Sequence, residues 1–65
     1  MNVEAVARRV LAEFEEMPGM ALTVPQASRL FGLDAAACRT VVDQLVGRSY
    51  LKWTRAGVIV RAEPS

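Results

Sequence analysis

The chain has 65 residues, of which 52% are hydrophobic, and carries a formal net charge of +1 and a single cysteine. This length accommodates one domain, and one cysteine excludes both an internal disulfide and the paired cysteines of a zinc site. Because a small domain has little interior in which to bury apolar groups, apolar surface should remain for a second subunit or another protein.

The charges are unevenly distributed along the chain. Four of the seven acidic residues lie in residues 1–20, whereas six of the eight basic residues lie in residues 21–65. Glu4 and Arg8 interrupt any apolar run after Met1, so the sequence predicts neither a signal peptide nor a membrane span. We therefore expect a cytoplasmic protein.

Residues 3–17 are predicted to form an amphipathic helix, because apolar side chains recur at intervals of three and four. Pro18 and Gly19 should end this helix. The apolar stripe consists of Val3, Val6, Ala7, Val10, Phe14 and Met17. The opposite side holds Arg8, Ala12, Glu15 and Glu16. The predicted homodimer interface consists of Leu11, on the flank of the stripe, and of Met17 and Met20 near its end.

The segment "MALTVPQASRLFG" predicts a second, short helix. Thr23 and Gln26 have the spacing of a capping box, and Pro25 falls in the first turn, where its missing N–H costs nothing. Gly32 should end the helix. The expected buried side consists of Ala27, Leu30 and Phe31.

A third helix should begin after Asp34, which is a favourable N-cap residue. At 100° per residue, one side of this helix faces the core and the other faces solvent. The predicted core residues are Cys38, Val41, Val42 and Leu45. The solvent-facing ridge consists of Ala36, Thr40, Asp43 and Gly47, with Arg39 and Gln44 on its shoulders.

After Ser49 the pattern changes to two β-branched or aromatic runs, "YLKWT" and "VIVRA", joined by "RAG". This pattern predicts a hairpin with Gly57 in the left-handed conformation. "ALT" before the second helix offers a third strand. Trp53 either faces the core beside Leu51 or anchors a partner on an exposed sheet face.

The sequence thus predicts a mainly α domain with a small β-hairpin, an α+β class with the element order α-(β)-α-α-β-β. The domain is expected to span residues 1–62, and residues 63–65 form a C-terminal tail.

The segment "LTVPQASRLFGLDAAACRTVVDQLVGRSYLKWTRAGVIVR" resembles the helix-turn-helix and wing of bacterial winged-helix transcriptional regulators. The shared pattern is a short Ala- and Leu-rich helix, "GL", a helix ending in "LV", an aromatic–Leu pair and a hairpin with a Gly tip. Where that family usually has a Gly before the "YL" pair, this chain has Ser49, so the third helix is expected to end early.

The resemblance implies that the third helix enters the major groove of DNA and that the wing touches the backbone. The groove-facing residues would then be Ala35, Ala36, Arg39, Thr40 and Asp43, of which Ala36, Arg39 and Thr40 are the base-facing candidates. Phosphate contacts would fall to Arg29, Lys52 and Arg55. Alternatively, Arg39 pairs with Asp43 four residues later.

These features predict a small DNA-binding transcriptional regulator that acts as a homodimer. The alternative is a winged-helix module for protein–protein contact, which the neutral run from Ala35 to Ala37 favours. The chain has no histidine, and neither Ser28 nor Ser49 has a base to activate it. We therefore expect no enzyme activity, metal, cofactor or small-molecule substrate.

Overall fold

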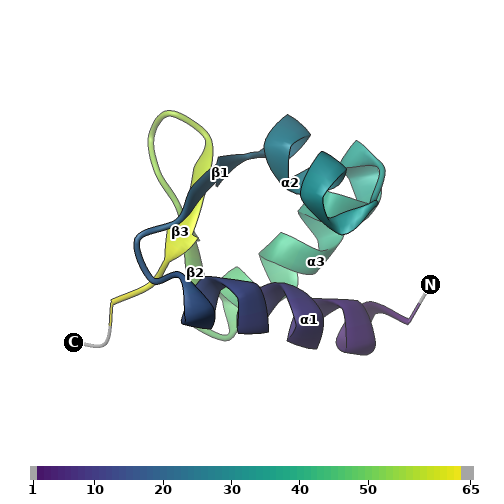
Figure 1. Ribbon diagram of the computed structural model, residues 1–65, viewed down its shortest axis with the longest axis horizontal. Helices are drawn as coiled ribbons and strands as arrows, with labels where there is room; N and C mark the ends of the chain where they lie inside the picture. Colours follow the sequence, from purple (N-terminus) through teal and green to yellow (C-terminus); the bar gives the residue numbers. More distant parts are fainter. Residues whose placement is uncertain (1, 64–65) are drawn as a thin grey trace.

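The computed structural model describes residues 2–63, so Met1, Pro64 and Ser65 lie outside the described part of the chain. It contains three helices and a three-stranded antiparallel sheet (Figure 1). The elements in chain order are α1 (Val3–Glu16), β1 (Ala21–Thr23), α2 (Val24–Phe31), α3 (Ala35–Gly47), β2 (Leu51–Trp53) and β3 (Val58–Arg61). The predicted α+β class and element order are confirmed. Two residues of the predicted tail, Pro64 and Ser65, cannot be assigned from the described residues.

Helix α1 begins at an N-cap that the sequence analysis did not identify. The Asn2 side chain accepts a hydrogen bond from the Ala5 N–H at 3.1 Å. The helix ends at Glu16, just before Pro18. Inclusion of Met17 in the apolar stripe was wrong, because Met17 follows the last helical residue and is 57% exposed. The buried residues of the stripe are Ala7, Val10 and Phe14.

Helix α2 has the predicted capping box. The Gln26 side chain accepts from the Thr23 N–H at 2.9 Å, and the Thr23 hydroxyl accepts from the Gln26 N–H at 3.3 Å. The prediction that Leu30 is buried was wrong, since its side chain is 50% exposed. Ala27 and Phe31 are the buried residues of this two-turn helix, and Ser28 is partly buried. Leu30 is rotated about 100° from Phe31.

Helix α3 is capped as predicted, with the Asp34 side chain accepting from the Ala37 N–H at 2.7 Å. Its four predicted core residues are at most 2% exposed. The helix ends at Gly47. Ser49 adopts a φ of +66°, and the N–H groups of Ser49 and Tyr50 bond the carbonyls of Val46 and Leu45 at 2.9 Å each. Serine thus occupies the left-handed position for which glycine is favoured.

We predict that Ser49→Gly stabilises the domain by about 0.5–1 kcal/mol. A left-handed non-glycine residue costs about 1–2 kcal/mol, and the larger entropy of glycine in the unfolded chain offsets part of the gain. Gly32→Ser is the reciprocal control, because Gly32 ends α2 at a φ of +67° with open space where a Cβ would lie. It should destabilise by a similar amount. Chemical denaturation measures both, and two shifts of the same sign would contradict the prediction.

The sheet has the strand order β1-β3-β2, so the "ALT" segment pairs with β3 as the third strand. Leu51 and Ile59 are buried on the side that faces the helices, whereas Lys52 lies opposite Val60 on the other side. The turn between β2 and β3 is closed by a hydrogen bond from the Gly57 N–H to the Thr54 carbonyl at 3.0 Å. Gly57 has the predicted left-handed conformation, with a φ of +77°.

One hydrophobic core joins the helices to the sheet. Phe14, Val41 and Ile59 are 0% exposed and come from α1, α3 and β3. Within residues 2–63, no polar or charged residue is buried. Because α3 packs against α1, α2 and β2, its orientation is fixed from three sides, and its remaining side carries the predicted site residues.

Candidate functional site

The outward ridge of α3 is exposed as predicted. Ala36, Arg39, Thr40, Asp43 and Gly47 are all exposed. They lie opposite the buried stripe of the same helix, which packs into the core. The sequence periodicity therefore placed all five residues correctly.

A hydrogen bond connects this ridge to the hairpin. The indole Nε1–H of Trp53 on β2 donates to Oδ1 of Asp43 on α3, at 3.0 Å. Trp53 is partly buried and packs against the core, which agrees with the core-facing alternative of the sequence analysis. The alternative in which Arg39 pairs with Asp43 is not observed among the described residues, where the carboxylate accepts from the indole. The bond sets β2 beside the α3 ridge.

The hydroxyl of Thr40 already donates a hydrogen bond within α3. Its Oγ1 donates to the Ala36 carbonyl oxygen one helical turn earlier, at 3.0 Å. The oxygen retains lone pairs, so Thr40 can accept a hydrogen bond from a ligand but has no proton to donate. Arg39 therefore provides the donors of this ridge.

The predicted phosphate-contacting residues come from three places. Arg29 is exposed in the last turn of α2, and Arg55 is exposed in the turn between β2 and β3. Lys52 is exposed on the sheet side opposite Trp53, so the structure does not place it on the side that meets α3. Within residues 2–63, none of these three side chains, nor that of Arg39, makes a hydrogen bond or ion pair. They are free to neutralise an anionic partner.

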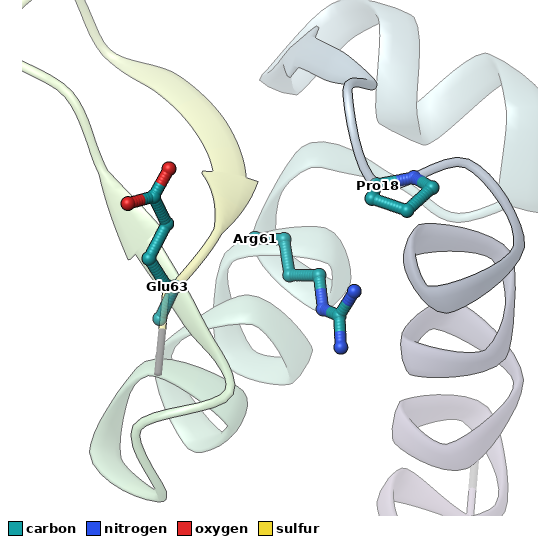
Figure 2. Close-up of a pocket in the computed structure, with 4 residues that line it drawn as sticks. Pro18, Arg61 and Glu63 are labelled. Carbon is teal, nitrogen blue, oxygen red and sulfur yellow. The ribbon is translucent and has the colours of Figure 1, made fainter. Parts of the chain in front are cut away.

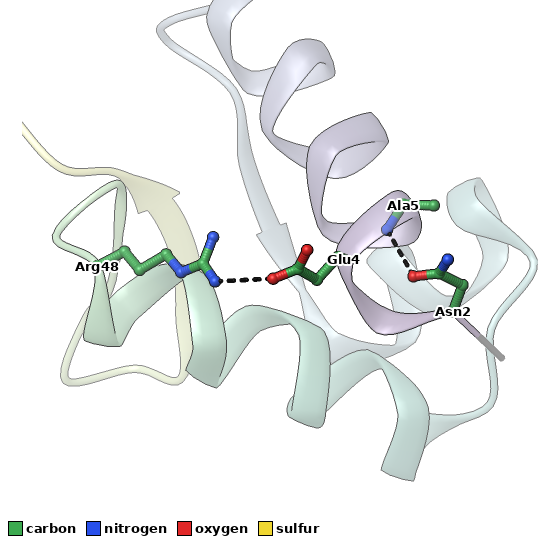
Figure 3. Close-up of polar contacts among 4 residues, drawn as sticks. All are labelled: Asn2, Glu4, Ala5 and Arg48. Atoms are coloured by element: carbon green, nitrogen blue, oxygen red, sulfur yellow. Dashed lines mark hydrogen bonds and ion pairs between the residues drawn. The ribbon is translucent and has the colours of Figure 1, made fainter.

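A fifth cation is paired across the fold. The Arg48 Nη2 lies 3.2 Å from Oε1 of Glu4, joining the end of α3 to the start of α1 (Figure 3). Both side chains are more than half exposed, so the pair contributes at most about 1 kcal/mol. No local pattern in the sequence indicates this partner, which lies 44 residues away.

A second surface feature runs along α1. Two hollows beside α1 and a third beyond its end adjoin one another, and we call the three together the α1 groove. The first, of about 190 Å³, and the second, of about 230 Å³, share Leu11 and Tyr50. The third, of about 140 Å³, shares Arg61 and Ala62 with the second. In Figure 2 the guanidinium of Arg61 points toward α1, with Pro18 beyond the helix end.

The predicted dimer residues occupy different positions relative to this groove. Leu11 is partly buried and lines two of the hollows. Met20 packs against the core, and Met17 is exposed beyond the helix. The sequence analysis missed Tyr50, which is 48% exposed in the centre of the groove. Tyr50 begins the run "YLKWT", which predicts a strand, so the local sequence does not indicate that its side chain lies in the groove.

Residues 2–63 contain no group of three or more Cys, Asp or Glu side chains placed to hold a metal ion. Over the same residues, no helix has the length and apolarity needed to cross a membrane. The chain matches no protein-family model, no curated protein and no solved structure.

Proposed function

We propose that this domain is a winged helix-turn-helix that binds double-stranded DNA and serves as a small cytoplasmic transcriptional regulator. The observation that carries the proposal is the hydrogen bond between Trp53 and Asp43. It attaches the hairpin to the flank of the exposed α3 ridge, which favours a binding surface made of a helix and a wing. A DNA major groove, about 12 Å wide, admits a helix presented in this way.

The side chains of this surface favour contacts with the DNA backbone over base reading. Arg29, Arg39 and Arg55 are exposed cations, and each phosphate contact adds to a salt-dependent affinity. Lys52 lies on the other side of the sheet and is not counted among them. On the ridge itself, Arg39 can bond guanine O6 and N7, and Thr40 can accept from a base amino group. Ala36 can only touch a thymine methyl. We therefore propose binding with weak sequence preference.

Two substitutions separate backbone contact from base reading. Arg55→Ala should weaken binding to all duplexes alike and lower the slope of log K against log salt by about one unit per bound copy. Arg39→Ala should reduce the difference in binding free energy between a preferred and a random duplex. A good bidentate contact to a base contributes about 1–3 kcal/mol to this difference. Fluorescence anisotropy with labelled duplexes over a salt series measures both quantities.

Arg9→Ala is the matched control, since Arg9 is exposed on α1 away from the ridge and should leave the binding unchanged. Duplex binding that is absent at low salt would refute the proposal. Binding that responds equally to Arg9→Ala, Arg39→Ala and Arg55→Ala would reflect general cation attraction and would also contradict it.

A second candidate function is protein–protein contact through the same face. The exposure of Leu30 at 50% favours it, because a large apolar side chain on α2 lies close in sequence to the neutral helix start at Ala35, Ala36 and Ala37. The exposed carboxylate of Asp43 would also repel phosphate. This function would take first place if no duplex binding were found.

A further inference from the structure

The α1 groove is an interaction surface that the proposed function does not use. In Figure 1, α1 runs along one edge of the molecule, and the turn between β2 and β3 projects from the opposite edge. A partner in the groove would therefore leave the hairpin tip free. The groove combines the partly buried Leu11 with Tyr50, which is 48% exposed, and charged side chains line its rim.

We propose that the α1 groove binds a second copy of this chain, with the two α1 helices antiparallel about a twofold axis near Leu11. The DNA-binding proposal does not depend on this contact, nor the contact on DNA. The shape of the groove and the pattern of its charges both favour this contact.

The shape of the groove suits contact between identical surfaces. Leu11 and Tyr50 line both of the first two hollows, of about 190 and 230 Å³, and of the two only Tyr50 is exposed, at 48%. In a twofold contact the same patch meets itself, so a projection must lie beside a hollow. Here Tyr50 of each copy can enter a hollow of the other.

The charges of the groove are complementary to those of a second copy. Arg8 lies three residues before Leu11 and Glu15 four residues after it, and these two exposed side chains line the first and second hollows. When two such helices run antiparallel around Leu11, Arg8 of each copy lies opposite Glu15 of the other. A parallel arrangement would place like charges opposite each other, which is unfavourable.

The other charges at the rim are compatible with this arrangement. Glu4 and Arg48 line the first hollow but already neutralise each other at 3.2 Å. Arg61 lines the second hollow together with Glu15 and also lines the third, beside Glu63, so an acidic side chain lies at each hollow that Arg61 reaches. A standard interface covers about 800 Å² per partner, which is roughly a fifth of the 4346 Å² surface of one copy.

Exchange of the charges tests the arrangement, with the oligomeric state measured by sedimentation in the absence of DNA. The wild-type chain should form a dimer as its concentration rises. Arg8→Glu and Glu15→Arg should each raise the dimer dissociation constant at least about tenfold, because each places like charges opposite each other twice. The double variant with both substitutions should restore the wild-type constant. Arg9→Glu and Glu16→Arg are the controls, since neither side chain lines the groove, and they should change it little.

Three outcomes would overturn the proposal: a wild-type chain that stays monomeric at every concentration, single reversals that match the controls, or a double variant that fails to recover. Circular dichroism confirms that each variant is folded, which is expected because all four positions are exposed. Leu11→Glu adds a test at the centre, where it should abolish the dimer. The oligomeric state is measured without DNA, so a failure to form the dimer can be distinguished from a failure to bind duplex DNA.

Discussion

Leu45→Ala should destabilise the domain by about 2–5 kcal/mol, the range for truncation of a buried leucine. Leu45 is 2% exposed, and its helix packs against α1, α2 and β2. The cavity would therefore weaken contacts between several elements at once. A domain of this size has a total stability of roughly 3–10 kcal/mol, so a large fraction of the variant should be unfolded.

Leu30→Ala is the matched control, because it removes the same atoms from a helical leucine that is 50% exposed. Its effect should stay within about 0.5 kcal/mol. Trp53 is the only tryptophan of the chain, so its fluorescence during denaturation reports unfolding in both variants. Equal midpoints for Leu45→Ala and Leu30→Ala would show that α3 does not pack as described.

The features that the sequence predicted correctly are those determined by local spacing. The Thr23–Gln26 capping box depends on residues three apart, and Gly57 marks its turn by its own conformational freedom. The four core residues of α3 follow from a stripe that persists for more than two turns. Such patterns need no knowledge of the rest of the fold.

Where the prediction failed, tertiary packing decided the outcome. Helix α2 is too short for its periodicity to distinguish a face through Leu30 from one through Ser28, and contacts with the rest of the fold select the second. At Ser49, the strand that follows needs a sharp turn, and the two hydrogen bonds at the end of α3 hold a serine in the left-handed region.

The part of the candidate site that depends on local spacing was predicted, and the part that depends on tertiary packing was not. The exposed ridge of α3 follows from periodicity alone. The connection between Asp43 and Trp53 spans ten residues and two elements, so the i,i+4 rule instead paired Asp43 with Arg39. The α1 groove depends on Tyr50 and Arg61 reaching α1 from distant parts of the chain, which no local pattern encodes.

Trp53→Ala should destabilise the domain by about 3–4 kcal/mol, the lower part of the range for truncation of a large aromatic residue, because the side chain is only partly buried. The substitution removes both the packing of the ring against the core and the indole bond to Asp43. Denaturation followed by circular dichroism measures the loss, since the variant lacks the fluorescent reporter. If the proposed function holds, duplex binding should also fall, because the hairpin is no longer held beside α3.

Asp43→Asn is the control that separates the bond from the charge. Its amide oxygen can still accept the indole N–H, so the stability should stay close to that of the wild type. The substitution also removes a negative charge from the proposed DNA-binding face. Because two unit charges about 4 Å apart in water repel by about 1 kcal/mol, duplex binding should tighten about two- to fivefold at low salt. Weaker duplex binding by a fully stable Asp43→Asn variant would show that the α3 ridge does not approach phosphate, whereas a Trp53→Ala variant as stable as wild type would show that the indole does not anchor the hairpin.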